Sequence, residues 1–286
     1  MPIMTPFPAT DVALEGFRLT REKPGAVAVW AAVRVGFTLV AVLVMNAVSG
    51  PQLTGFMTAV AAGRSVDELE RAAEPLLPTL AGLVPFDLAV QAVLMTAVFR
   101  AVTQPITTGH FHLRLSVEEL RMFGINLLGM STLMFAAVLV SVVGGGISVL
   151  ASAAGPIGPL IAAAYFAVVV ASGGYVAVRL SLIPALTQVE GRFALSHGWR
   201  LTAGRHWVLL GVYVMAAILG GLVYMLGAVI GSVFQLLDAS HAPSFTSLAS
   251  LLSTAWMALV GVLISVILQA PGAAAVQAAL SVRTSV

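Results

Sequence analysis

The sequence predicts an all-α polytopic membrane protein with six transmembrane helices. Of its 286 residues, 59% are hydrophobic and only 9% are charged, which is more apolar surface than a soluble domain of this length could bury. Its long apolar stretches each reach the roughly 20 residues that a bilayer requires. They lack the alternation of membrane β-strands, so helices, which satisfy their own backbone hydrogen bonds, are expected.

We treat residues 1–286 as a single membrane domain, with a cytoplasmic amphipathic segment at 1–24 and a six-span bundle at 25–283. The first apolar stretch follows Arg18, Arg21 and Lys23, as a signal peptide would, but it is too long for a signal peptide and is interpreted as a retained span. The expected spans are residues 25–49, 76–99, 123–150, 157–178, 207–237 and 248–270.

Two connections carry helix-start signals. In the first external connection, about residues 50–75, Ser65 is followed three residues later by Glu68, which is the capping-box pattern and predicts a short external helix. On the other side, the same arrangement begins at Ser116 and runs through Glu118 and Glu119. There it predicts a short interfacial helix leading into the third span.

The distribution of basic residues predicts the orientation. All but one of the 14 basic residues are arginines, and the side that holds the connection after the second span, the connection after the fourth span and both termini carries most of them. The positive-inside rule therefore places both termini in the cytoplasm. Arginine in place of lysine, together with abundant Ala, Val and Gly, is typical of a GC-rich bacterial genome. The expected location is therefore a bacterial inner (cytoplasmic) membrane.

A short sequence pattern recurs before the spans. Residues 16–20 (Gly-Phe-Arg-Leu-Thr) match residues 198–202 (Gly-Trp-Arg-Leu-Thr), and residues 119–122 give a looser copy. The match predicts three membrane hairpins, each preceded by a cytoplasmic amphipathic helix, in an approximately threefold arrangement. The alternative is convergence, because any interfacial helix favours an aromatic residue, an arginine and a leucine at helical spacing.

The repeated unit also has a common end and common anchors. Arg100 precedes Pro105 by five residues, Arg179 precedes Pro184 by the same offset, and Pro271 closes the sixth span without the arginine. The expected interfacial anchors, whose rings enter the lipid boundary while the guanidinium groups meet headgroups, are Phe17, Arg18, Trp199 and Arg200.

Residues 179–186 (Arg-Leu-Ser-Leu-Ile-Pro-Ala-Leu), continued by Gly191, residues 194–196, residues 199–204 and residues 209–211, resemble the signature of the glycerophosphodiester phosphodiesterase membrane-domain family. The resemblance covers the second half of the chain, whereas the first half matches mainly in layout. It implies a six-span bacterial membrane fold. The phosphodiesterase activity of some relatives belongs to a separate soluble domain, for which no residues remain here, so the activity is not expected to transfer.

The informative charges within the expected spans are Arg34 and Asp87. Arg34 lies about 15 Å along a helix from Pro24, and Asp87 lies about 20 Å from Arg100, so their depths are comparable. A lone charge at this depth costs several kcal/mol, and we therefore predict that the two residues pair. The pair can be read as a salt bridge that fixes packing, which we favour, or as a polar site for an ion, proton or lipid headgroup.

Small residues at offsets of four, seven and four form a stripe along the fifth span, and they predict close packing against another helix. The stripe consists of Ala216, Gly220, Gly227 and Gly231. Residues 144–146, three consecutive glycines, are interpreted as a frayed end of the third span rather than as an unwound substrate-binding segment.

Several chemistries lack the residues they need. There is no cysteine, and His110 and His112 have no acidic or cysteine partner nearby, so no metal and no cofactor are expected. The acidic pair before the third span and His197 are similar to motifs of intramembrane glutamate proteases, but their spacing is wrong. A net charge of +2 in scattered clusters argues against a nucleic-acid partner.

The expected function is a non-catalytic module that organises or accompanies lipid or envelope processes, with membrane lipids and a membrane protein as partners. The alternative is a transporter or channel for a small or lipid-like solute, using a cavity between the hairpins. A transporter needs a continuous polar path, whereas the spans show scattered groups such as Arg34, Asp87, Gln91 and Asn126. An intramembrane hydrolase is the third alternative, for which we find no nucleophile beside a base.

Overall fold

The computed structural model describes residues 9–104, 109–236 and 247–284, and all regular structure in these ranges is helical. In chain order the helices are α1 (Ala9–Ala13), α2 (Glu15–Glu22), α3 (Pro24–Ala61), α4 (Val66–Ala73), η1 (Glu74–Leu76), α5 (Leu77–Thr103), η2 (Gly109–His112), α6 (Val117–Ala153), η3 (Gly155–Ile157), α7 (Gly158–Leu180), α8 (Ile183–Glu190), α9 (Leu195–Leu201), α10 (His206–Leu236) and α11 (Leu248–Thr284).

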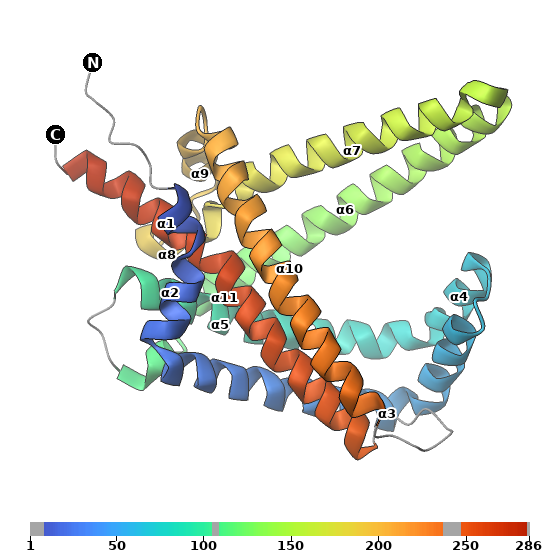
Figure 1. Ribbon diagram of the computed structural model, residues 1–286, viewed down its shortest axis with the longest axis horizontal. Helices are drawn as coiled ribbons and strands as arrows, with labels where there is room; N and C mark the ends of the chain where they lie inside the picture. The colour runs from blue at the N-terminus through green and yellow to red at the C-terminus, as the bar shows by residue number, and fades with distance from the viewer. Residues whose placement is uncertain (1–8, 105–108, 237–246, 285–286) are drawn as a thin grey trace.

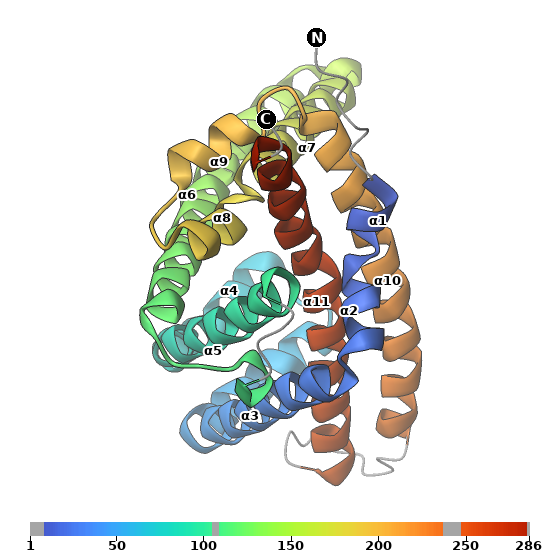
Figure 2. The same cartoon turned by 90° about the vertical axis from the view of Figure 1, so that its left-hand side faces the viewer.

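Six helices, α3, α5, α6, α7, α10 and α11, are long and apolar enough to cross a membrane. The predicted all-α class with six candidate spans is confirmed for the described residues. Helices that follow one another along the chain also pack together: α3 with α5, α6 with α7, and α10 with α11. Figure 1 shows these pairs diverging from one region, and Figure 2 shows the same region turned toward the viewer.

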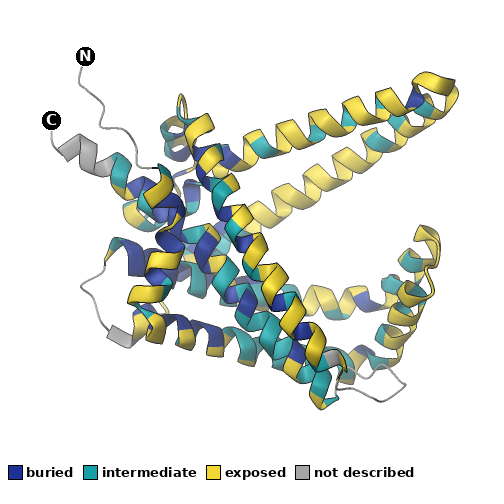
Figure 3. Ribbon diagram, viewed as in Figure 1, coloured by how far each residue is buried: buried dark blue, intermediate teal, exposed yellow. Residues whose placement is uncertain are grey.

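We call this region the helix junction: α1, α2, α8 and α9 with the adjacent ends of the long helices. It contains most of the buried apolar side chains, and Trp30, Phe99, Met122 and Leu186 are among the largest. Away from it the pair α6 and α7 is almost entirely exposed, as Figure 3 shows. Apolar side chains such as Phe135 are exposed there because these helices suit a lipid solvent.

Both predicted capping boxes are present. At α4, the Ser65 side chain accepts from the helix while Glu68 accepts from the Ser65 backbone N–H. At α6, Glu119 accepts a hydrogen bond of 2.8 Å from the Ser116 backbone N–H. The short helix predicted to lead into the third span is not a separate element, however. The helix that begins at Val117 continues without a break, because no residue there interrupts the backbone hydrogen bonds.

Three predicted helix ends are also wrong. α3 does not stop at residue 49: it bends where Ser49 leaves helical geometry, passes Pro51 and runs to Ala61. The triple glycine at 144–146 lies inside α6 rather than at a frayed end. Pro271 lies inside α11, since a proline removes only one backbone donor and a packed neighbourhood can hold the helix through it.

Arg100, at the end of α5, organises the junction. Its side chain is almost fully buried and donates to Glu118 at 2.7 Å and to Glu119 on α6, to the Ser116 hydroxyl at 3.4 Å and to the His112 carbonyl at 3.0 Å. The guanidinium of Arg100 therefore links the end of α5 to the α5–α6 connection and to the start of α6.

The two best-matching repeat copies have the same local geometry. Gly16 is buried so tightly against α11 that an added Cβ would lie 2.5 Å from the Ile267 Cα, and Gly198 would place one 2.6 Å from Ile183 of α8. On the opposite faces, the predicted anchors Phe17, Arg18, Trp199 and Arg200 are exposed. The glycine of each copy thus packs against another helix while the aromatic residue and arginine face outward.

The small-residue stripe of α10 faces α11. Ala216, Gly220, Gly227 and Gly231 are all buried. A Cβ on Gly227 would lie 2.7 Å from both methyl groups of Val260, and one on Gly220 would lie 3.5 Å from Ile264. Trp256 donates a hydrogen bond of 2.8 Å to the Gly227 carbonyl. Close backbone approach between these two helices therefore requires the stripe.

Substituting Gly227→Ala is expected to destabilise the detergent-solubilised protein by about 1–3 kcal/mol, because Val260 is stiff and has to move. Gly221→Ala on the same helix meets no atom within 4 Å and is the matched control. Thermal unfolding followed by circular dichroism measures both. Equal melting temperatures for the two variants would show that α10 and α11 do not approach this closely.

A buried histidine is held at the junction. His112 lies 3.3 Å from the ammonium group of Lys23, which also donates to the Ala101 carbonyl at 3.1 Å. Burial, together with the positive charges of Lys23, Arg100 and Arg114, lowers the pKa of His112 below its ordinary value of 6.5. The unfolded chain therefore binds this proton at a higher pH than the folded chain does.

Stability is accordingly expected to fall as the pH drops through about 6.5 toward the lower folded pKa of His112, and to be unaffected by this group above about 6.5. Melting temperatures measured between about pH 7.5 and pH 5.5 should decrease less in His112→Gln than in the unmodified protein. His206→Gln, which leaves His112 in place, is the control. An identical slope in all three proteins would contradict the assignment.

Candidate intramembrane polar site

The predicted charge pair lies between α3 and α5. Arg34 Nη1 donates to Asp87 Oδ1 at 2.6 Å, and the two side chains are 31% and 40% exposed. The structure therefore brings together the residues whose depths suggested a pair. Thr38, one turn beyond Arg34, donates to the Arg34 backbone carbonyl at 2.8 Å instead of to Asp87. The ion pair is open on one side rather than sealed within the helices.

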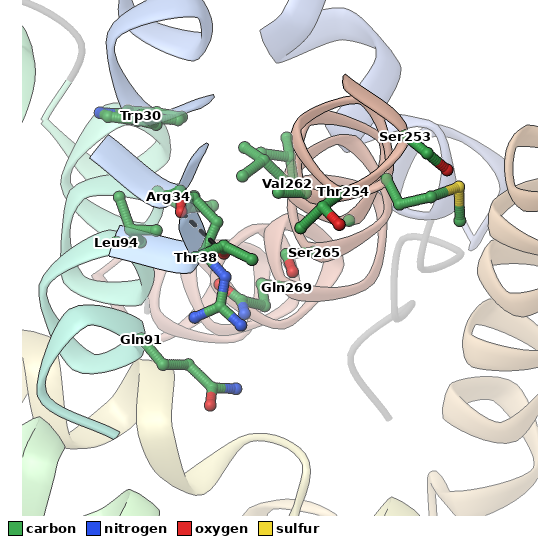
Figure 4. A pocket seen from close by; sticks show the side chains of 15 residues that line it. Trp30, Arg34, Thr38, Gln91, Leu94, Ser253, Thr254, Val262, Ser265 and Gln269 are labelled. Atoms are coloured by element: carbon green, nitrogen blue, oxygen red, sulfur yellow. Dashed lines mark hydrogen bonds between the residues drawn. The ribbon is translucent and has the colours of Figure 1, made fainter. Parts of the chain in front are cut away.

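Arg34 of this pair, but not Asp87, lines a cavity of about 460 Å³ between α3, α5 and α11. Figure 4 shows the polar side chains around it, which come from all three helices. The polar lining residues are Arg34, Thr38, Gln91, Ser253, Thr254, Ser265 and Gln269. The remaining wall is apolar and includes Trp30, Leu94, Met257 and Val262. The cavity is thus amphipathic, with a polar lining and an apolar wall.

Most of these polar groups lack a partner in the protein. Within the described ranges, the side chains of Gln91, Ser253, Thr254, Ser265 and Gln269 make no hydrogen bond to another residue. Ser253 is only 8% exposed. A hydroxyl or amide in an apolar environment costs free energy unless it is hydrogen-bonded. Groups that converge on one cavity without internal partners are therefore available to a polar guest or to water.

The electrostatics of the cavity favour a guest with little net charge. Asp87 compensates Arg34 and occupies one of the N–H groups of its guanidinium, which has five in all. The other lining groups are neutral hydroxyls and amides that can donate or accept. The cavity therefore suits a neutral or zwitterionic polar group attached to an apolar body.

The polar face of α11 was missed in the sequence analysis. Its lining residues Thr254, Ala258, Gly261, Ser265 and Gln269 follow one another at three or four positions, which places them on one helix face. That spacing is the signal that could have identified them. The polar groups of the spans are therefore less scattered than expected, because Arg34 and Gln91 gather with this face. Asn126 lies on α6, outside the cavity, and its amide nitrogen is buried without a partner within the described part of the chain.

The structure does not assemble the residues of the other candidate sites, the protease-like motif and the metal site, into a reactive or ligating arrangement among the described residues. Glu118 and Glu119, which are similar to a protease motif in sequence, bind Arg100. His197 pairs with Glu190. Among the described residues, no group of three or more His, Cys, Asp or Glu side chains could hold a metal ion. The α3–α5–α11 cavity is therefore the best-developed candidate site in the described chain.

No family model matches the chain, and neither a curated protein nor a solved structure matches it. The interpretation of the cavity therefore depends on its own residues.

Arg34→Ala and Asp87→Ala are each expected to destabilise the solubilised protein by about 1–3 kcal/mol, because each leaves one charge uncompensated. The double variant Arg34→Ala with Asp87→Ala should recover much of that loss. The control is Arg64→Ala, which removes an exposed partner of Glu68 at 3.6 Å and should change stability little. Simple additivity of the two single effects in a double-mutant cycle would show that Arg34 and Asp87 do not interact.

Proposed function

We propose that this chain is a non-catalytic module of a bacterial inner (cytoplasmic) membrane, with both termini cytoplasmic, that binds a lipid-like molecule in the α3–α5–α11 cavity. The proposal keeps three hairpins in an approximately threefold arrangement and membership of the glycerophosphodiester phosphodiesterase membrane-domain family. In this role the protein accompanies lipid or envelope processes without performing chemistry. Membrane lipids and a membrane-protein partner are its proposed partners.

The supporting observation is the set of five polar side chains that face the cavity without partners in the described chain. In the hydrocarbon of a bilayer no bulk water would solvate such groups, so a bound polar group or trapped water would have to do so. The apolar wall formed by Trp30, Leu94, Met257 and Val262 can contact acyl chains. A molecule with a polar group and an apolar chain matches the cavity better than an ion does, because an ion would need a net charge of opposite sign nearby.

A second candidate is a transporter for a lipid-like solute. Its support is the length of the polar face of α11, which extends from Ser253 to Gln269, about 24 Å along the helix. That distance approaches the hydrocarbon thickness of a bilayer, about 30 Å. A headgroup could move along such a face while its acyl chains remain in lipid.

The binding proposal is tested by purifying the protein in native lipid and identifying the retained lipids by mass spectrometry. A triple variant, Gln91→Leu, Ser265→Ala and Gln269→Leu, is expected to retain about tenfold less of the specific lipid, because it removes several hydrogen bonds of about 1 kcal/mol each. The control variant, Thr132→Val with Ser148→Ala, removes exposed hydroxyls of α6 that bond only to their own helix.

Equal lipid retention by the triple variant, the control variant and the unmodified protein would refute the binding proposal. A flux assay in liposomes separates the two candidates. A binding module leaves a fluorescent lipid on its original leaflet, whereas a transporter moves it, and the triple variant then slows that movement.

A further inference from the structure

A second cavity lies at the junction, apart from the α3–α5–α11 site. It has a volume of about 740 Å³ and is formed by the end of α8, the α8–α9 connection, α9, the connection to α10 and one residue of α11, Ala279. Its lining is rich in hydrogen-bond donors, including Ser196 and His197. The proposed function makes no use of this cavity.

The charges around this cavity are unbalanced. Three arginines line it, Arg192, Arg200 and Arg205, against one carboxylate, Glu190. Glu190 is already engaged, since it accepts from Arg192 at 2.9 Å and pairs with His197. Within the described ranges, Arg200 and Arg205 make no ion pair and no side-chain hydrogen bond. Two guanidinium groups therefore remain available to an anion.

The backbone directs these arginines to one place. Arg200 lies in the last turn of α9, and the chain then reverses through Gly204, whose φ of +78° favours glycine. A hydrogen bond of 3.2 Å from the Arg205 N–H to the Thr202 carbonyl closes this turn. Arg192 comes from the connection on the other side of α9. The positive-inside rule explains arginines on this side but not their convergence from three segments on one cavity.

Exposed aromatic residues place the cavity near a lipid boundary. Phe193 lines the cavity, Trp199 is in the same short helix as Arg200, and Trp207 is in the first turn of α10, two residues after Arg205. All three side chains are exposed. Aromatic side chains of this kind are concentrated where a membrane meets water. Basic pockets at that level bind anionic headgroups.

We propose that this cavity binds a phosphate-bearing anionic group through Arg200 and Arg205, with Ser196 and His197 as further donors. The chemistry is that of a phosphate ester, and an anionic phospholipid headgroup and a soluble phosphate ester would both provide it. Paired guanidinium groups match phosphate oxygens in geometry as well as charge. This site differs from the cavity of the proposed function in the charge of its ligand and, apart from Ala279 of α11, in the segments that line it.

The test uses the full-length protein in nanodiscs of phosphatidylcholine with and without phosphatidylglycerol, analysed by native mass spectrometry. The unmodified protein is expected to retain phosphatidylglycerol preferentially, and Arg200→Gln with Arg205→Gln to weaken that retention about tenfold. The matched control is Arg21→Gln with Arg114→Gln, which removes the same charge from exposed arginines outside the cavity and should retain the preference.

A separate measurement titrates glycerol 3-phosphate and inorganic phosphate into the protein in phosphatidylcholine nanodiscs. Saturable binding that depends on Arg200 and Arg205, without a preference for phosphatidylglycerol, identifies a soluble phosphate ester as the source and supports the site. Arg200→Lys with Arg205→Lys keeps the charge and is expected to bind at an intermediate level even if the glutamine variant fails to fold.

Three outcomes overturn the proposal. An equal loss of anionic lipid in the control variant would indicate a diffuse basic field, and retention by the lysine variant that is as low as that of the glutamine variant would show that the positive charges are not involved. The third outcome is that the unmodified protein binds neither phosphatidylglycerol nor soluble phosphate. None of them bears on lipid retention in the α3–α5–α11 cavity, because the triple variant of that cavity leaves Arg200 and Arg205 intact.

Discussion

The buried guanidinium of Arg100 is the interaction on which the helix junction depends. It is the last charge of α5, and it meets Glu118 and Glu119 at the start of α6. Gln188 of α8 donates to Glu118 at 2.8 Å, so the same cluster reaches a third helix. A buried charge with excellent geometry fixes one arrangement, because removing Arg100 would leave both Glu118 and the buried Glu119 without their common cation. Helix pairs that diverge toward the lipid are therefore joined firmly at one end.

Packing away from the junction follows different rules. Lipid is as apolar as the side chains that face it, so helices gain little there from apolar burial and depend on close backbone approach. α10 and α11 use the small-residue stripe for this purpose, whereas α6 and α7 remain exposed along most of their length. Tyr165 of α7, which donates to the Val140 carbonyl of α6, is one of the few polar links between that pair.

The two cavities lie in these two differently packed regions, one among the long helices and one at the junction. The α3–α5–α11 cavity lies where α11, packed against α10 on one side, turns its polar face toward Arg34 and Gln91. The arginine cavity lies where the short helices of the junction reverse the chain. The first is close to neutral and partly apolar, and the second is basic and beside exposed aromatic residues.

The sequence by itself determined the class, the number of candidate spans, both capping boxes and the comparable depths of Arg34 and Asp87, because each depends on composition or spacing within one segment. It did not determine that α11 continues through Pro271, since neighbouring helices decide whether a proline interrupts a packed helix. It identified no partner for Arg100, and the polar face of α11 that includes Gln269 was not recognised. Periodicity fixes the face and depth of a residue, but only tertiary packing decides which other helix that face meets.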